Sequence, residues 1–208
     1  MQVNHEQLGR GLGLTVTEQA RRAQIIEATI DTVAELGYGR TSFAKIVERA
    51  GLSSTRMISY HFRGKDELML ATAGAIVDNQ DSFLTERLAG TRDRVDMLRT
   101  WIRAEVAFLG AHPRQARALL EIGTNARSTE GPPLLDAVWR DMRVGRLERQ
   151  LAQGQREGVF GAFDVEVLAL AIRQAIDGVA LRLAAEPELD LDTYGRQLAD
   201  LFSKAARA

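Results

Sequence analysis

The stretch that decides the fold reads TSFAKIVERAGLSSTRMISYHF, residues 41–62. Its first half carries apolar residues at a spacing of three or four, which predicts a short helix with one buried face. Gly51 ends that helix, because glycine is the usual residue just past a helix end. The hydroxyls of residues 53–55 can cap a second short helix that continues to about residue 61. The pattern therefore predicts two short helices joined by a tight turn. The apolar face of the first consists of Phe43, Ile46, Val47 and Ala50.

Outward from this stretch, the chain shows only helical patterns. Thr15 and Glu18 have the spacing of a capping box, which predicts a helix start there. Sustained alternation typical of strands is missing, so we expect an all-α protein of about nine helices. Residues 1–14, with three glycines, are expected to form a flexible arm. The predicted helices cover about residues 15–36, 41–50, 53–61, 65–88, 93–111, 114–126, 134–157, 164–185 and 192–206.

Charge is distributed unevenly along the 208 residues. The whole chain carries a formal charge of -1. Between Leu36 and Lys65, however, six basic residues face a single acid, so this segment carries +5 and the remainder -6. Because phosphate contacts are made by a few placed cations, such segregation is compatible with a nucleic-acid surface on an acidic body. A solvated basic face would give the same pattern.

Several function classes are excluded or disfavoured. The chain has no cysteine, which removes disulfides, thiolate metal sites and cysteine nucleophiles. The three histidines lack the spacing of a metalloprotease helix, and no phosphate loop or nucleophile elbow is present. The first residues lack the features of a signal peptide, and no apolar run could span a bilayer. We expect a cytoplasmic protein that is not an enzyme and that needs no metal or cofactor.

The second short helix could enter a DNA major groove. Its apolar residues can face the core, which leaves small hydrogen-bonding side chains and one arginine on the open face. Two packed helices joined by a glycine turn, without any DNA, would explain the same pattern. The expected open face is Ser54, Thr55, Arg56, Ser59, Tyr60 and His61.

The order of motifs over about residues 18–70 resembles the N-terminal domain of the tetracycline-repressor (TetR) family. The similarity lies in residues 41–53, in ISYHF at 58–62 and in GKDEL at 64–68. One residue more than usual separates Gly51 from Phe62, which leaves Ser54, Thr55 and Arg56 as alternatives for base contact. The resemblance implies a helix-turn-helix domain over residues 15–64 and a helical effector and dimerisation domain over residues 65–208. The DNA-contacting residues it implies are Thr41, Ser42, Ser53, Ser54, Thr55, Arg56, Ser59, Tyr60, His61 and Lys65.

The C-terminal part resembles the family only loosely. The stretch IDGVALR, residues 176–182, looks like the dimer helix of the branch that contains the choline-responsive repressor of betaine synthesis. Residues 164–206 are apolar on more than one face, which together with the family pattern predicts a homodimer. Between the two regions, large apolar residues with a few polar neighbours suit a small-molecule pocket. The candidates are Trp101, Phe108, Ile122, Asn125, Trp139, Met142, Gln174 and Asp177.

The resulting hypothesis is a ligand-responsive transcriptional regulator, and the family resemblance implies a repressor. It would bind a pseudo-palindromic operator as a dimer and be released by a small-molecule effector. Two alternatives stay open. One is a helical small-molecule binding or catalytic protein in which the helix-turn-helix serves only as structural packing and does not bind DNA. The other is a DNA-binding protein without an effector.

Overall fold

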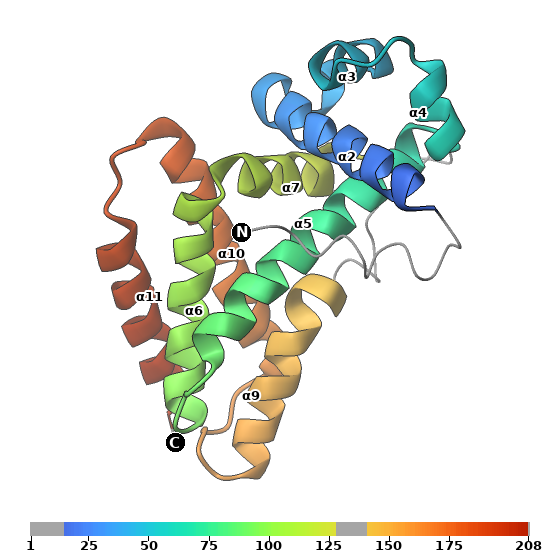
Figure 1. Cartoon of the computed structure of the whole chain (residues 1–208). Coiled ribbons are helices and arrows are strands. Elements are labelled where there is room, and N and C mark those ends of the chain that lie inside the picture. The colour runs from blue at the N-terminus through green and yellow to red at the C-terminus, as the bar shows by residue number, and fades with distance from the viewer. Residues whose placement is uncertain (1–14, 128–140, 208) are drawn as a thin grey trace. The chain divides into compact units, whose positions relative to one another are not determined.

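The computed structural model describes residues 15–127 and 141–207. Within these ranges the chain is predominantly α-helical, and an isolated antiparallel bridge pairs Phe160 with Arg207. This confirms the expected all-α class. The helices are α2 (Val16–Leu36), α3 (Phe43–Ala50), α4 (Arg56–His61), α5 (Lys65–Leu88), α6 (Arg94–Ala111), α7 (Pro113–Asn125), α9 (Arg146–Arg156), α10 (Val165–Ala185) and α11 (Leu191–Ala205), with short 3-10 and π segments η1 (Tyr38–Arg40) and η2 (Asp141–Gly145) (Figure 1).

Side chains that cap helix starts explain most of the boundaries. The Thr15 hydroxyl accepts the Glu18 amide at 3.3 Å, while the Glu18 carboxylate accepts the Thr15 amide at 2.8 Å, so the predicted capping box is present. The carboxylates of Asp93, Asp164 and Asp190 each accept the amide three residues on, and thereby begin α6, α10 and α11. Such caps satisfy amides that a helix start leaves without a partner.

Two boundaries differ from the sequence-based expectation. The second short helix begins at Arg56, and the Thr55 side chain makes no capping hydrogen bond because Thr55 already has helical backbone angles. The expectation that a hydroxyl caps this helix was therefore wrong. The helix expected over residues 134–157 lies partly outside the described residues, and its described part opens with the π-helical segment η2 before α9.

The chain forms two compact units. The first contains residues 15–79 together with α7 from Arg117 onwards, and the second contains residues 80–116 and the described chain after residue 140. In the second unit α11 lies along α6, and α10 packs against α6 and α9 (Figure 1). Its core includes Trp101, Ile102, Leu147, Ile172, Ile176 and Phe202.

In the first unit, α2 holds both helices of the helix-turn-helix. Ile25 of α2, Ile46 of α3 and Ile58 of α4 are completely buried. Two polar side chains of α2 bind the last carbonyls of the same helices: Gln24 donates to Ala50 at 2.7 Å and Arg22 donates to His61. The turn between α3 and α4 and its two helices are therefore fixed by one element.

Gly51 in that turn provides a test of backbone conformation. Its φ is +63°, in the left-handed region, and a methyl group added there would meet no atom within 4 Å. The Gly51→Ala variant should lose about 1 kcal/mol in the free energy of unfolding, because a side chain is disfavoured at this φ. Urea unfolding followed by circular dichroism measures the loss.

Gly39→Ala is the matched control, since an added methyl group there also meets open space while its φ lies outside that region. We expect a change within about 0.5 kcal/mol. Equal losses in the two variants would contradict the explanation.

Candidate nucleic-acid interface

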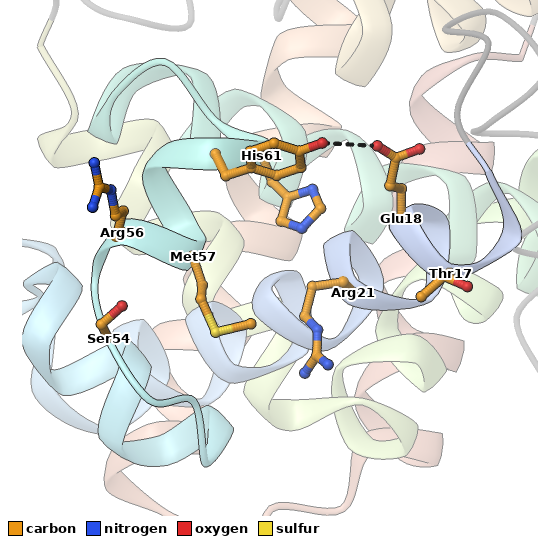
Figure 2. A pocket seen from close by; sticks show the side chains of 8 residues that line it. Thr17, Glu18, Arg21, Ser54, Arg56, Met57 and His61 are labelled. Carbon is orange, nitrogen blue, oxygen red and sulfur yellow. Dashed lines mark hydrogen bonds between the residues drawn. The ribbon is translucent and has the colours of Figure 1, made fainter.

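A pocket of about 400 Å³ lies between the start of α2 and the helix α4. Thr17, Glu18 and Arg21 come from α2, and the other side is formed by α4 and the turn before it (Figure 2). Four side chains expected to contact DNA therefore share one site. They are Ser54, Arg56, Tyr60 and His61, with Met57 beside them.

A hydrogen bond joins the two sides of the pocket. The Tyr60 hydroxyl donates to the Glu18 carboxylate at 3.2 Å, which is the dashed line in Figure 2. The Thr15 amide and hydroxyl also donate to Glu18, and together with Tyr60 they lower the pKa of this carboxyl. Glu18 is thus an ionised acceptor that orients Tyr60, a residue that is 74% exposed. A carboxylate in this position also keeps the pocket from being uniformly positive.

His61 is the side chain of the pocket whose ordinary pKa lies nearest to neutral pH. Burial lowers its pKa below the usual value, with Arg22 and Arg21 adding to the effect and Glu18 opposing it. The imidazole lies edge-on to the Tyr60 ring, with centroids 4.9 Å apart. In the protein alone His61 is therefore neutral at pH 7, and a nearby phosphate would favour its charged form.

Arg56 differs from the other basic residues of the segment 36–65. Lys45, Lys65 and Arg40 donate to backbone carbonyls, and Arg49 and Arg63 pair with Glu35 and Glu67. Arg56 is exposed, and the described residues supply no partner for its guanidinium. Of the six cations in the segment, it is therefore the one without a partner among the described residues.

The other expected DNA contacts lie in different environments. Ser42 caps α3 through the Lys45 amide at 3.5 Å, and it is exposed like Ser53, Thr55 and Ser59. Thr41 is buried, and its hydroxyl donates to the Gly37 carbonyl at 2.9 Å.

Lys65 is half-buried. Its ammonium donates to the Tyr38 and Thr41 carbonyls at 3.2 and 3.0 Å and lies 4.2 Å from the centre of the Tyr38 ring. Burial lowers its pKa. Lys65 thus ties the start of α5 to the segment before α3, and Thr41 stabilises that segment.

The expected effector contacts are divided between the two units. Ile122 and Asn125 belong to α7 in the first unit, where Asn125 is exposed and donates to Glu121. In the second unit Trp101 and Phe108 are buried, Gln174 is exposed, and Asp177 accepts hydrogen bonds from two arginines. Trp139 and the Met142 side chain lie outside the described residues.

Sequence reasoning missed the contribution of α2 to the pocket. Thr17, Glu18 and Arg21 share a face at helical spacing, and that regular polar face is the signal that could have indicated them. The sequence does not encode which neighbour this face meets, because α4 is about forty residues away along the chain.

The remaining chemistry of the described residues is sparse. No group of three or more possible metal-ligating side chains occurs among them. Over the same ranges, every helix is too short or too polar to cross a bilayer.

These features define a helix-turn-helix protein with an exposed polar second helix, and comparisons with known proteins agree. Residues 25–72 match the family model described as bacterial regulatory proteins, tetR family. An HTH-type transcriptional regulator from Mycobacterium tuberculosis is 38% identical over 77 residues, which cover 35% of this chain and 39% of that protein. The HTH-type transcriptional regulator BetI from Cronobacter sakazakii is 27% identical over 179 residues, 79% of each chain.

Solved structures show the same fold. A TetR family transcription regulator from Marinobacter aquaeolei superposes with a TM-score of 0.75 at 20% identity, over 92% of this chain and 97% of that one. The transcriptional regulator FadR from Bacillus subtilis, solved in complex with stearoyl-CoA, gives 0.73 at 19% identity over 89% and 99%. The chain is thus similar to the TetR family of bacterial regulatory proteins over residues 25–72 and, over most of its length, to the transcriptional regulator BetI. Its relatives are regulators rather than enzymes, which confirms the expectation that it is not an enzyme.

A contact between His61 and a DNA phosphate would make DNA binding dependent on pH. Because burial and two arginines lower the pKa of His61 in the free protein, a phosphate beside it should raise that pKa and couple binding to proton uptake. The affinity for duplex DNA should therefore increase as the pH falls from about 8 to about 6, by up to about tenfold for each unit of pKa difference. Fluorescence anisotropy at constant ionic strength measures this dependence.

The His61→Gln variant keeps a polar side chain that does not titrate in this range, and its affinity should change much less with pH. An unchanged pH dependence in this variant would show that another group takes up the proton.

Proposed function

We propose that the protein is a dimeric repressor that binds a pseudo-palindromic operator through α4 and is released by a small-molecule effector. The observation that carries DNA binding is the open face of α4, where exposed Arg56 lacks a partner in the described chain. Arginine can make a bidentate contact to guanine in the major groove, the commonest specific contact of this kind. Because its partner would be chromosomal DNA, the protein would act in the cytoplasm.

The proposed contacts follow from the positions of the side chains. Arg56, Ser54 and Tyr60 would meet base edges or the adjacent backbone, and Ser42 at the start of α3 would meet a phosphate. His61 and Arg21 would neutralise a phosphate near the pocket. Thr41 and Lys65 would act mainly by positioning, although one N–H of the Lys65 ammonium is still available to a phosphate.

A second copy of the chain is the proposed partner of α10 and α11. On α10, Val167, Leu170 and Leu181 are 64%, 43% and 62% exposed, while the opposite face of the helix is buried in the core. Leu201 on α11 is 58% exposed. The exposed residues of α10 recur at helical spacing, with Gly178 among them, where an added methyl group would meet open space. An apolar stripe of this kind suits a twofold contact between subunits.

The direct test is salt-titrated binding of the full chain to DNA from upstream of its own gene. Saturable binding to a defined pseudo-palindrome, with affinity falling steeply as salt increases, is expected. Weak binding that is equal for all sequences would contradict operator recognition at that locus, and selection of bound genomic fragments would then locate a distant operator or show that there is none. An effector that binds without changing operator affinity would contradict release, because the coupling must be reciprocal.

Arg56→Ala should weaken operator binding by about 10- to 100-fold, the usual range for a lost base contact, and relax the preference at one base position. Anisotropy titrations with the operator and with single-base variants measure both effects. Arg92→Ala is the matched control, since Arg92 is an exposed arginine of the other unit, and it should bind like the wild type. If Arg56→Ala also binds like the wild type, base recognition does not depend on Arg56.

Leu181→Glu should convert the dimer to monomers, because it places a charge in the apolar stripe of α10. Sedimentation velocity measures the change, and the far-ultraviolet circular dichroism should stay that of the wild type. The control is Leu70→Glu, which changes a leucine of α5 that is 44% exposed and should leave the dimer intact. A dimer that survives Leu181→Glu would place the subunit contact elsewhere.

A further inference from the structure

The second unit buries a cluster of charged side chains that DNA binding does not use. Glu105 of α6 and Arg173 of α10 are paired at 2.8 Å, and their side chains are only 6% and 5% exposed. Gln80 of α5 donates to the same Glu105 oxygen at 2.7 Å. One turn further along α10, Asp177 accepts from Arg173 at 3.1 Å and from Arg143 of η2 at 2.9 Å. Four elements of this unit therefore meet at one polar cluster.

The charges of this cluster are balanced. It contains two guanidinium groups and two carboxylates, so its formal charge is zero. Burial by itself would lower the pKa of Arg173, but the neighbouring Glu105 and Asp177 carboxylates outweigh it, and the pKa is raised. Arg173 is therefore held in its charged form inside the protein.

One donor of the cluster is unused. Across residues 15–127 and 141–207, the Arg173 Nε is the single buried side-chain nitrogen or oxygen without a hydrogen-bond partner. Its terminal nitrogens bind Glu105 and Asp177, so the orientation of the guanidinium group is fixed by two ion pairs. Buried donors without an acceptor are rare and unfavourable, and each calls for an explanation.

The residues that flank Glu105 and Arg173 along their two helices include large apolar side chains. Trp101 and Ile102 lie one turn before Glu105 on α6, and Ile172 and Ile176 lie beside Arg173 on α10, all of them buried. A molecule that reaches the Arg173 Nε would thus place its oxygen on a fixed donor and its remaining atoms against hydrocarbon. This combination of an apolar lining with a few placed polar groups is that of small-molecule sites.

We infer that the Arg173 Nε anchors the effector and that the effector is an uncharged, largely apolar molecule with a carbonyl-type oxygen, such as an ester. This inference rests on the proposed function, in which an effector exists. The charge balance of the buried cluster determines the chemical class of the effector. A carboxylate would add an uncompensated negative charge beside Glu105 and Asp177, whereas a quaternary ammonium has no acceptor to offer. A neutral oxygen completes the hydrogen bonding of Arg173 and leaves the charge at zero.

The test uses three matched series of probes with saturated chains of six to twelve carbons: methyl esters, free carboxylates and alkyltrimethylammonium ions. The full-length protein is examined by thermal unfolding, by titration calorimetry and by the NMR signal of the Arg173 Nε–H. Esters of at least one chain length should raise the Tm, bind with the lowest Kd and shift that signal. The matched carboxylates and ammonium ions should bind at least tenfold more weakly.

Arg173→Lys removes the Nε donor and keeps a positive charge. It also serves to assign the NMR signal, and it should weaken ester binding about tenfold, the effect of one lost hydrogen bond. Arg99→Lys, at a half-exposed arginine of α6 paired with Asp200, is the control and should bind esters like the wild type. If Arg173→Lys does not fold, the charge-balanced double variant Arg173→Gln with Glu105→Gln replaces it.

The inference is overturned if carboxylates bind as well as esters, if esters bind equally to Arg173→Lys, or if no ester raises the Tm. Operator binding, measured in the same preparations, separates this failure from that of the proposed function. Intact operator binding without ester binding would reject the ligand class alone. Ester binding at Arg173 without any operator binding would reject the regulator and leave a small-molecule binding protein.

Discussion

The helix-turn-helix depends on the contacts by which α2 fixes the ends of α3 and α4. A helix of six residues is not stable in water, so α4 must be stabilised by its neighbours. Ile58 and Phe62 anchor it in the core, and Arg22 binds its last carbonyl and lies 4.1 Å from the centre of the Phe62 ring. Gln24 likewise donates to the last carbonyl of α3, that of Ala50. Because these contacts use only the inner face of α4, its outer face stays free while its position is fixed.

Most basic side chains of residues 36–65 also stabilise the protein itself. A net charge of +5 over residues 36–65 gives the impression of six cations for phosphate, but five of them bind groups of the protein itself. Lys65 illustrates the point, because its ammonium holds two carbonyls and lies against Tyr38. Local charge in a sequence therefore overestimates the charge available to a ligand. Arg56, beside the pocket, is the cation of this segment that has no partner in the described chain.

The sequence predicted helices well where a single local signal determines them. The capping box joins Thr15 and Glu18, and the aspartate caps of α6 and α10 likewise bind the amide three positions on, so these signals can be recognised without the fold. The start of α4 was misplaced because no local cap marks it, and packing on α2 determines where it begins. Signals of this second kind become visible only when the neighbouring helix is known.

The predictions of site residues divide in the same way, between those that local sequence signals determine and those that depend on a distant helix. The open face of α4 could be predicted from its own pattern, since its apolar residues identify the inner face. The partner across the pocket could not, because Glu18 and Tyr60 are 42 residues apart. Likewise, Asp177 was selected as polar near apolar residues, but its link to Glu105 runs through Arg173, which is 68 residues from Glu105. Gln174, next to Arg173 in the sequence, is exposed, so proximity along the chain gave no guide to burial.

Helix α10 takes part in both functions proposed for the second unit, effector binding and contact with a second subunit. Its buried face carries Arg173 and Asp177, and its exposed face carries Leu170 and Leu181, so residues of the two faces alternate within single turns. A packed helix responds to a change on one face as a unit, because its side chains leave few voids into which part of it could relax. A ligand that completes the hydrogen bonding of Arg173 would therefore act on the element that a second subunit would contact. Binding of the ligand and the arrangement of the dimer must then influence each other equally, since coupling between two sites is reciprocal.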